Sequence, residues 1–222
     1  MFSKFHKIFD SLTKFERQIF QGAALIFVFS LLLNGTNVFY QRTILSPIEG
    51  GSYTEGIVGQ PIAINPLISL SNDTDRDLIE LVFSDLLELT DDYEVSDDHK
   101  VWTVELRENL LWSDGEPLNA EDVIFTLETI QNPETHSPLF TTWQSVRAAK
   151  INEREVRFVL KTPYAFFLDN LRALKVTPQH IFGAIPAANL RLADYNLEPV
   201  GSGPYAFASY RKRKDGFISE YR

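Results

Sequence analysis

The sequence predicts a mixed α+β domain that follows one apolar helix near the N-terminus. Two observations support this fold class. From residue 51 onward, strand-like and helix-like segments alternate without the regular β–α–β rhythm of a parallel sheet, which favours an α+β or irregular α/β lobe. Before them, residues 19–40 form an uncharged stretch of 22 residues, long enough to cross the apolar part of a bilayer.

The apolar stretch is interpreted as a transmembrane anchor or uncleaved signal. Residues 1–18 carry four lysine or arginine and two aspartate or glutamate side chains, and this positive excess predicts a cytoplasmic tail. A cleaved signal peptide remains an alternative, although no convincing small-x-small site follows Leu33. A buried core helix is a further alternative, although Ser30 is the only polar residue in 23–33. Residues 41–50 are expected to be a linker, and the domain at 51–222 is expected outside the cytoplasm, giving a single-pass protein of the cell membrane.

Two elements are expected at the start of the domain. Alternating β-forming residues predict a strand over 51–58, which Gly59-Gln60-Pro61 interrupts. The segment from Asp73 to Leu87 has apolar residues at i, i+4 and i+8, and therefore predicts an amphipathic helix. Asp73 or Thr74 is expected to cap it.

The middle of the domain carries stronger local signals. Residues 101–106 predict a strand, and 110–112 a short extended piece that ends in a tight turn at Gly115. Asn119 is expected to cap a helix that ends at Asn132-Pro133. The remaining expected elements are strands at 145–151 and 155–161, short helices at 165–171 and from 178 onward, and a strand at 204–210 that turns at 214–216 into a return strand at 217–221.

Composition excludes several function classes. A net charge of −9 argues against a nucleic-acid partner, and the basic run 211–214 is interpreted as a solvated hairpin tip. The absence of cysteine excludes disulfides, thiolate metal sites, cysteine nucleophiles and a lipid-modified cysteine.

No catalytic, cofactor or metal site is expected. The four histidines lack metal-ligand spacing, and the acidic residues between 91 and 98, interpreted as a surface turn, lack the pattern of a calcium loop. Gly201-Ser202-Gly203 lacks the outer glycines of a nucleophile elbow, so a secreted hydrolase is the most remote alternative.

Five segments, in order, resemble the family-5 extracytoplasmic solute-binding proteins, which are the dipeptide- and oligopeptide-binding components of ABC importers. The densest match runs from Leu106-Arg107 through Trp112-Ser113-Asp114-Gly115 to Ala120-Glu121-Asp122-Val123 and on to Leu127. The other matches are Ile64-Asn65-Pro66-Leu67, Lys161 to Leu168, Thr177 to Ile181, and Pro199-Val200-Gly201-Ser202-Gly203-Pro204-Tyr205.

The resemblance implies the N-terminal lobe of a two-lobed, periplasmic-binding-protein type II-like fold. It implies an extracytoplasmic binding protein without enzyme activity, whose partners are a peptide or other small solute and the permease of an ABC importer. The ligand-binding residues that it suggests are Tyr53, Trp112 and Tyr205. Structural roles are expected for Asn65, Pro66, Asp114, Gly115, Asp122, Gly201, Gly203 and Pro204, the two later glycines through unusual φ values or close backbone approach.

The chain also departs from the family pattern. The connection between the first domain helix and the strand at 101–106 is short, and the chain is expected to stop before the second lobe, which carries much of the ligand contact. The ligand is left open between peptides, nickel complexes, sugars and other solutes. The alternative function is a structural or interaction domain that takes no part in transport and binds no ligand.

Overall fold

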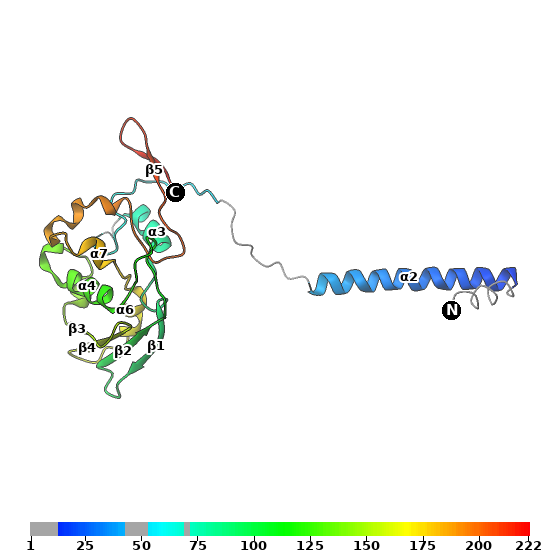
Figure 1. Cartoon of the computed structure of the whole chain (residues 1–222), viewed down its shortest axis with the longest axis horizontal. Helices are drawn as coiled ribbons and strands as arrows, with labels where there is room; N and C mark the ends of the chain where they lie inside the picture. The colour runs from blue at the N-terminus through cyan, green and yellow to red at the C-terminus, as the bar shows by residue number, and fades with distance from the viewer. Residues whose placement is uncertain (1–12, 43–52, 69–71) are drawn as a thin grey trace. The chain divides into compact units, whose positions relative to one another are not determined.

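The computed structural model describes residues 13–42, 53–68 and 72–222 (Figure 1). The chain divides into two compact units, Met1–Glu55 and Gly56–Arg222. The first contains helix α2 (Lys14–Arg42), and the predicted membrane segment 19–40 lies wholly within it. Residues 1–12 of the expected tail and 43–50 of the expected linker lie outside the described residues.

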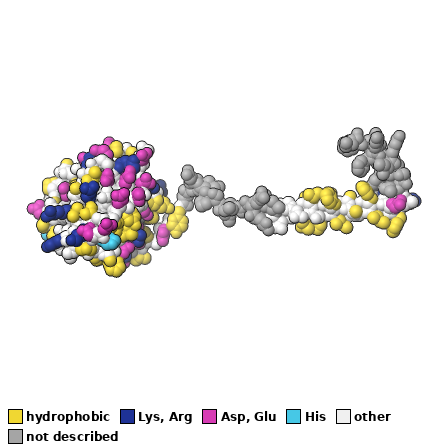
Figure 2. All heavy atoms as spheres, turned by 90° about the horizontal axis from the view of Figure 1, so that it is seen from below, with side chains coloured by type: hydrophobic (Ala, Val, Ile, Leu, Met, Phe, Trp, Pro, Cys, Tyr) yellow, Lys and Arg dark blue, Asp and Glu magenta, His cyan; other side chains and the backbone are white. Residues whose placement is uncertain are grey.

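Helix α2 presents its apolar side chains outward. Figure 2 shows hydrophobic side chains along its surface, and none of its most apolar window is buried. By length and composition, Lys14–Asn37 could cross a membrane. Within its own unit the helix is exposed, as a membrane anchor or a signal would be.

A four-stranded antiparallel sheet organises the second unit. Its order is β1 (Thr90–Val95), β2 (Val101–Leu106), β4 (Glu155–Leu160) and β3 (Val146–Lys150). Alternate residues of β2 and β4 are buried, as the two-residue period of a strand requires. Helix α4 (Ala120–Gln131) contacts β3 and β4, so the sheet has one covered face. In Figure 1 the sheet lies at one end of this unit and the hairpin containing β5 at the other.

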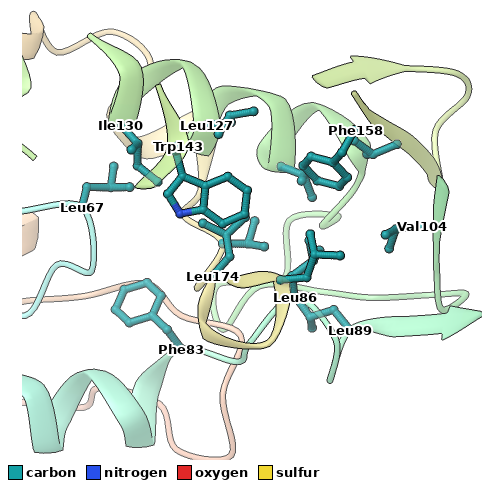
Figure 3. Close-up of a cluster of buried hydrophobic side chains, with 14 of the residues drawn as sticks. Leu67, Phe83, Leu86, Leu89, Val104, Leu127, Ile130, Trp143, Phe158 and Leu174 are labelled. Carbon is teal, nitrogen blue, oxygen red and sulfur yellow. The ribbon is translucent and has the colours of Figure 1, made fainter. Parts of the chain in front are cut away.

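The core lies between the sheet, α4 and several connecting segments. Figure 3 shows side chains from these elements converging, among them Phe83, Leu127, Trp143 and Phe158. Phe167, at the start of α6 (Phe167–Ala173), places its ring against three aromatic side chains. The ring centroids lie 5.5 Å from Trp102, 5.8 Å from Trp143 and 6.1 Å from Phe158. We call these four residues the aromatic cluster.

The cap of α4 follows the sequence prediction. The Asn119 side chain accepts from the Glu121 N–H at 2.8 Å, and Asp122 Oδ2 accepts from the Asn119 N–H at 3.0 Å. This reciprocal pair is a capping box, and Asn132 ends the helix as expected. The strands at 101–106, 145–151 and 155–161 and the short helices are also confirmed within one or two residues. The remaining short helical elements are η1 (Pro133–Thr135), α5 (Phe140–Trp143), α7 (Gln179–Phe182), η2 (Ala187–Leu192) and η3 (Asp194–Asn196).

Helix α3 (Asp73–Val82) begins at Asp73 as predicted but is shorter than predicted, and its cap lies one residue before the expected Asp73 or Thr74. Asn72 is its cap, because its side-chain oxygen accepts from the Thr74 N–H at 3.1 Å. The helix does not reach Leu87, since Phe83 has extended backbone and Asp85 forms a bridge with Lys175. If the helix continued, the carbonyl groups of Leu81, Val82 and Phe83 would accept hydrogen bonds from residues further along the helix. Here they accept hydrogen bonds from distant parts of the chain instead.

Two predicted strands are wrong over most of their length. The described part of 51–58 is irregular, and residues 204–209 belong to no strand. Strand β5 (Tyr210–Lys212) starts only at Tyr210 and pairs with β6 (Ile218–Tyr221). A strand needs a neighbour along its length, whereas the Tyr205 N–H bonds to the Leu81 carbonyl of α3 at 3.1 Å. The turn between β5 and β6 and its basic run are as predicted, with Gly216 at φ +86°.

The acidic stretch after α3 contains a strand that the sequence did not indicate. Asp91, Asp92 and Glu94 lie in β1, and only Asp97 and Asp98 occupy the expected turn. Strand β1 is an edge of the sheet, and its middle residues are exposed. Charged side chains at an edge oppose pairing with another chain, so the acidic run is compatible with a strand there.

Candidate functional site

Residues 199–205, which we call the crossover segment, run across the end of α3. The Gly203 N–H donates to the Val82 carbonyl at 2.7 Å, and the Tyr205 N–H donates to Leu81. The Ser113 N–H donates to the Gly201 carbonyl at 2.8 Å, next to Trp112. The structure therefore places two of the family-like motifs, at 106–127 and 199–205, side by side.

Close packing explains the two glycines of the crossover segment. A Cβ atom on Gly201 would overlap the Val82 carbonyl oxygen, and one on Gly203 would lie 2.6 Å from the Leu81 oxygen. Neither glycine has a left-handed φ. The expected close approach of the backbone is therefore confirmed, and the expected unusual φ value is wrong. Gly115 shows the opposite case, with φ +92° and open space around its Cα. Its conformational freedom serves the turn at 113–116.

Asp122 connects three segments beneath the crossover. Besides the Asn119 N–H, its carboxylate accepts from the Trp112 indole N–H at 3.3 Å and from the Gln179 N–H at 2.8 Å. Burial raises the pKa of Asp122, while the N–H groups of Gln179 and Asn119 favour its charged form. One side chain thus caps α4 and ties the Trp112 turn to the start of α7.

The turn before α4 also contacts α7 through Asp114 and His180. Asp114 Oδ2 lies 2.8 Å from His180 Nε2, and 31% of each side chain is exposed. Burial opposes ionisation of Asp114, but hydrogen bonds from His180 and the Glu116 N–H outweigh it and hold the pKa of Asp114 below its usual range. The sequence offered no signal for this pair, because the two residues are far apart along the chain.

The segment before α3 joins the same region. Asn65 is fully buried, and its amide donates to the Asn196 side chain at 3.0 Å while its oxygen accepts from the Leu67 N–H. Pro66 is buried beside it. The carboxylate of Asp75, in α3, accepts from the N–H groups of Ile62 and Ala63 at 2.7 and 3.0 Å. The 64–67 motif therefore lies next to the stretch that leads into the crossover segment.

Lys175 is a buried cation that the sequence analysis did not single out. It is 7% exposed, and its ammonium group donates to the Phe83 carbonyl and to Asp85 at 3.0 Å each. Glu80 lies at the same distance. These contacts hold the extended residues after α3 against the chain that precedes α7.

The three predicted ligand-binding residues differ in environment. Trp112 is 2% exposed, and its indole N–H is used by Asp122. Tyr205 is 60% exposed, next to the exposed Pro204. Tyr53 is 82% exposed and precedes the second compact unit. The structure brings the motifs of Trp112 and Tyr205 together, and a ligand contact of any of the three stays a prediction.

An exposed apolar surface lies where β6 meets the segment before α3. The Gln60 side chain donates to the Ile218 carbonyl at 3.0 Å and accepts from the Ile218 N–H at 2.8 Å. This pair of bonds locks the two segments together beside the exposed side chains of Val58, Ile62 and Phe217. We call these three residues, with Gln60, the hairpin face. Within the described ranges, no group of three or more histidine, aspartate or glutamate side chains could hold a metal ion.

Comparisons with known proteins show which family this chain is similar to. A family model described as bacterial extracellular solute-binding proteins, family 5 Middle, matches residues 87–216. The oligopeptide-binding protein AppA of Bacillus subtilis is 27% identical over 190 residues, which cover 80% of this chain and 35% of the relative. The chain therefore spans about a third of the length of that relative.

Solved structures give the same result. The structure of Bacillus subtilis AppA with a nonapeptide matches with a TM-score of 0.65 and 25% identity, over 72% of this chain and 36% of that one. CtaP of Listeria monocytogenes, an ABC transporter substrate-binding protein, matches with a TM-score of 0.63 and 30% identity. The match covers 70% of this chain and 33% of CtaP. NikZ of Campylobacter jejuni, solved with Ni(L-His), matches with a TM-score of 0.60 and 28% identity. The match covers 75% of this chain and 35% of NikZ.

Replacing Gly203 should show how tightly the crossover segment is packed. We expect Gly203→Ala to lower the free energy of unfolding by about 2 kcal/mol, because the new methyl group meets backbone atoms of α3 that must move. Urea unfolding of the full chain in detergent, followed by tryptophan fluorescence, measures this. Gly56→Ala is the matched control, since nothing lies within 4 Å of its added Cβ. Equal stability of the two variants would contradict the packing argument.

Acid titration should reveal the Asp114–His180 contact. Because the folded pKa of Asp114 is lowered, its charge stabilises the fold above the unfolded pKa, and this contribution disappears as pH falls through the folded pKa. We expect the stability difference between wild type and Asp114→Asn to shrink between about pH 5 and about pH 2. Unfolding curves at several pH values measure the difference. A gap that stays constant with pH would count against the proposed charge effect.

Proposed function

This chain belongs to family 5 of the bacterial extracellular solute-binding proteins, and we propose that it acts as the extracytoplasmic binding component of an ABC importer of peptides. The family match and the solved neighbours confirm the resemblance and the predicted lobe of a two-lobed fold. The observation that carries the proposal is that hydrogen bonds link four family-like segments. Gly201 bonds to Ser113, Asp122 to Gln179, and Asn65 to Asn196 in the stretch that leads to residue 199. Tyr205 and the apolar side chains of the hairpin face are exposed, and these are the groups that we propose contact the ligand.

Peptides are the ligand class that the relatives favour. AppA is described as oligopeptide-binding, and its structure contains a nonapeptide. Exposed apolar side chains suit an extended peptide, whose own side chains they can contact. The neighbour solved with Ni(L-His) makes nickel–amino-acid complexes the second ligand class to test.

We propose that the described domain supplies one wall of the ligand site. Two-lobed binding proteins enclose a ligand between lobes that close by hinge motion. The chain spans about a third of its relatives' length, and its hairpin face is open to solvent. A surface that covers the ligand from one side loses much of the burial on which tight binding depends. Enclosure of the peptide therefore requires a second lobe over the hairpin face and Tyr205.

The membrane arrangement is part of the proposal. Helix α2 has the length and composition of a span, and the basic excess in residues 1–18 favours a cytoplasmic N-terminus. This orientation places the domain on the extracytoplasmic side, where a binding protein meets its permease. Since the chain contains no cysteine, a lipid-modified cysteine cannot hold it at the membrane, and α2 takes that role.

Uptake by living cells tests the transport function. We expect cells that lack this chain to lose uptake of a labelled tripeptide, and wild type or Gly56→Ala to restore it. Labelled Ni(L-His) is followed in parallel. If peptide uptake were unchanged and Ni(L-His) uptake were lost, nickel–amino-acid complexes would replace peptides as the ligand class. If neither uptake changed, a domain without a transport role would be favoured. Titration calorimetry on the chain alone should give peptide dissociation constants weaker than about 1 mM, because one wall buries too little of the ligand.

The N-terminus of the mature protein tests the anchor. We expect intact-mass spectrometry of the membrane fraction to find α2 retained, because no small-x-small site follows Leu33. Alkaline carbonate extraction should leave the chain in the membrane pellet. A mature N-terminus between residues 34 and 45 would show a cleaved signal and contradict the anchor.

A further inference from the structure

A hollow of about 320 Å³ opens at the corner of the sheet where β3 begins and β4 ends. The pairing of Val146 with Leu160 brings these strand ends together, and α5, α6 and the loop 161–166 complete the walls. The hollow includes much of the family-like segment 161–168. None of the lining residues belongs to the crossover segment or to the hairpin face.

The floor of the hollow is apolar and held in place. Val146, Leu160 and Phe167 are all buried. Phe167 belongs to the aromatic cluster, and its contacts with Trp102, Trp143 and Phe158 restrict its ring. A floor that is already ordered requires no further ordering when a ligand binds, which favours affinity.

The walls carry polar groups that the rest of the described chain does not use. The side chains of Thr142, Ser145, Thr162, Tyr164 and Asn170 line the hollow, and none forms a hydrogen bond with another described side chain or with the described backbone. Such groups can donate to or accept from a bound molecule in place of water.

The charged groups that line the hollow are of one sign. Lys161 is the only ionisable side chain besides Tyr164 in the lining, and no carboxylate lines it, although the chain has a net charge of −9. Within the described residues Lys161 forms no ion pair, whereas Lys150 and Lys175 each lie against two carboxylates. An ammonium group without a carboxylate partner, beside several hydroxyl groups, favours an anion.

We propose that this hollow binds a small carboxylic acid with one apolar group. The carboxylate lies against Lys161 and neighbouring hydroxyl groups, and the apolar group covers the floor of Val146, Leu160 and Phe167. The volume lies at the small end of the range for ligand sites, which fits a compound of the size of an N-acylated amino acid. All the residues of this site belong to the described chain, and none of them is part of the proposed peptide surface.

Two matched probes test the proposal on the full chain in detergent. N-acetyl-leucine carries the carboxylate and the apolar group. N-acetyl-leucinamide has the same apolar group but a neutral amide in place of the carboxylate. We expect titration calorimetry to give a dissociation constant below about 1 mM for the acid, and binding at least about tenfold weaker for the amide. In amide NMR spectra the acid should shift resonances of residues 142–146 and 160–170.

Variants separate the hollow from nonspecific binding. Lys161→Gln should weaken the binding of N-acetyl-leucine at least about tenfold, which corresponds to about 1.4 kcal/mol. Lys214→Gln, on the β5–β6 turn, should leave this affinity unchanged. Thr162→Val is a second variant that should weaken binding, and tryptophan fluorescence checks that each variant is folded. The proposal is overturned if N-acetyl-leucine does not saturate the chain below about 10 mM, or if Lys161→Gln binds it as tightly as wild type does. It is also overturned if inorganic phosphate binds equally well, or if the acid shifts resonances of the crossover segment.

Discussion

The domain depends on how the last carbonyl groups of α3 are used. Those of Leu81, Val82 and Phe83 accept from Tyr205, Gly203 and Lys175. Helix ends need such partners, and here the partners come from distant segments, so ending the helix also joins those segments. The join requires backbone to approach backbone at Gly201 and Gly203, which a side chain would prevent. The hairpin and the sheet are thereby connected through one short region.

Buried polar groups extend that region into a network. Asp122 takes part in the capping box of α4 and also accepts from Trp112 and Gln179. A buried carboxylate is costly unless hydrogen bonds satisfy it, so removal of any of these donors would affect the others. The most family-like residues of the chain therefore support the fold. The crossover segment also positions the exposed Tyr205, which, with the hairpin face, is where we propose that the ligand contacts this domain.

Two surfaces of this domain differ in their physical chemistry. The hairpin face is apolar, open and built from segments that meet at Gln60, which suits a surface completed by further protein and an extended ligand. The hollow by Lys161 is small and has polar walls over an apolar floor, which suits a single small anion with an apolar group. Only the hollow rests on the four-stranded sheet, since the aromatic cluster beneath it also fills the core behind β2 and β4.

The sequence by itself determined the elements that depend on neighbouring residues. The Asn119 cap, the turn at Gly115, the alternating strand at 101–106 and the apolar helix α2 each arise from interactions within a few positions, so their patterns were sufficient. Tertiary structure decided the end of α3, the irregular path of 204–209, the pairing of β1 and the contact of Asp114 with His180. Each of these depends on a hydrogen-bond partner far along the chain, whose position no local pattern specifies.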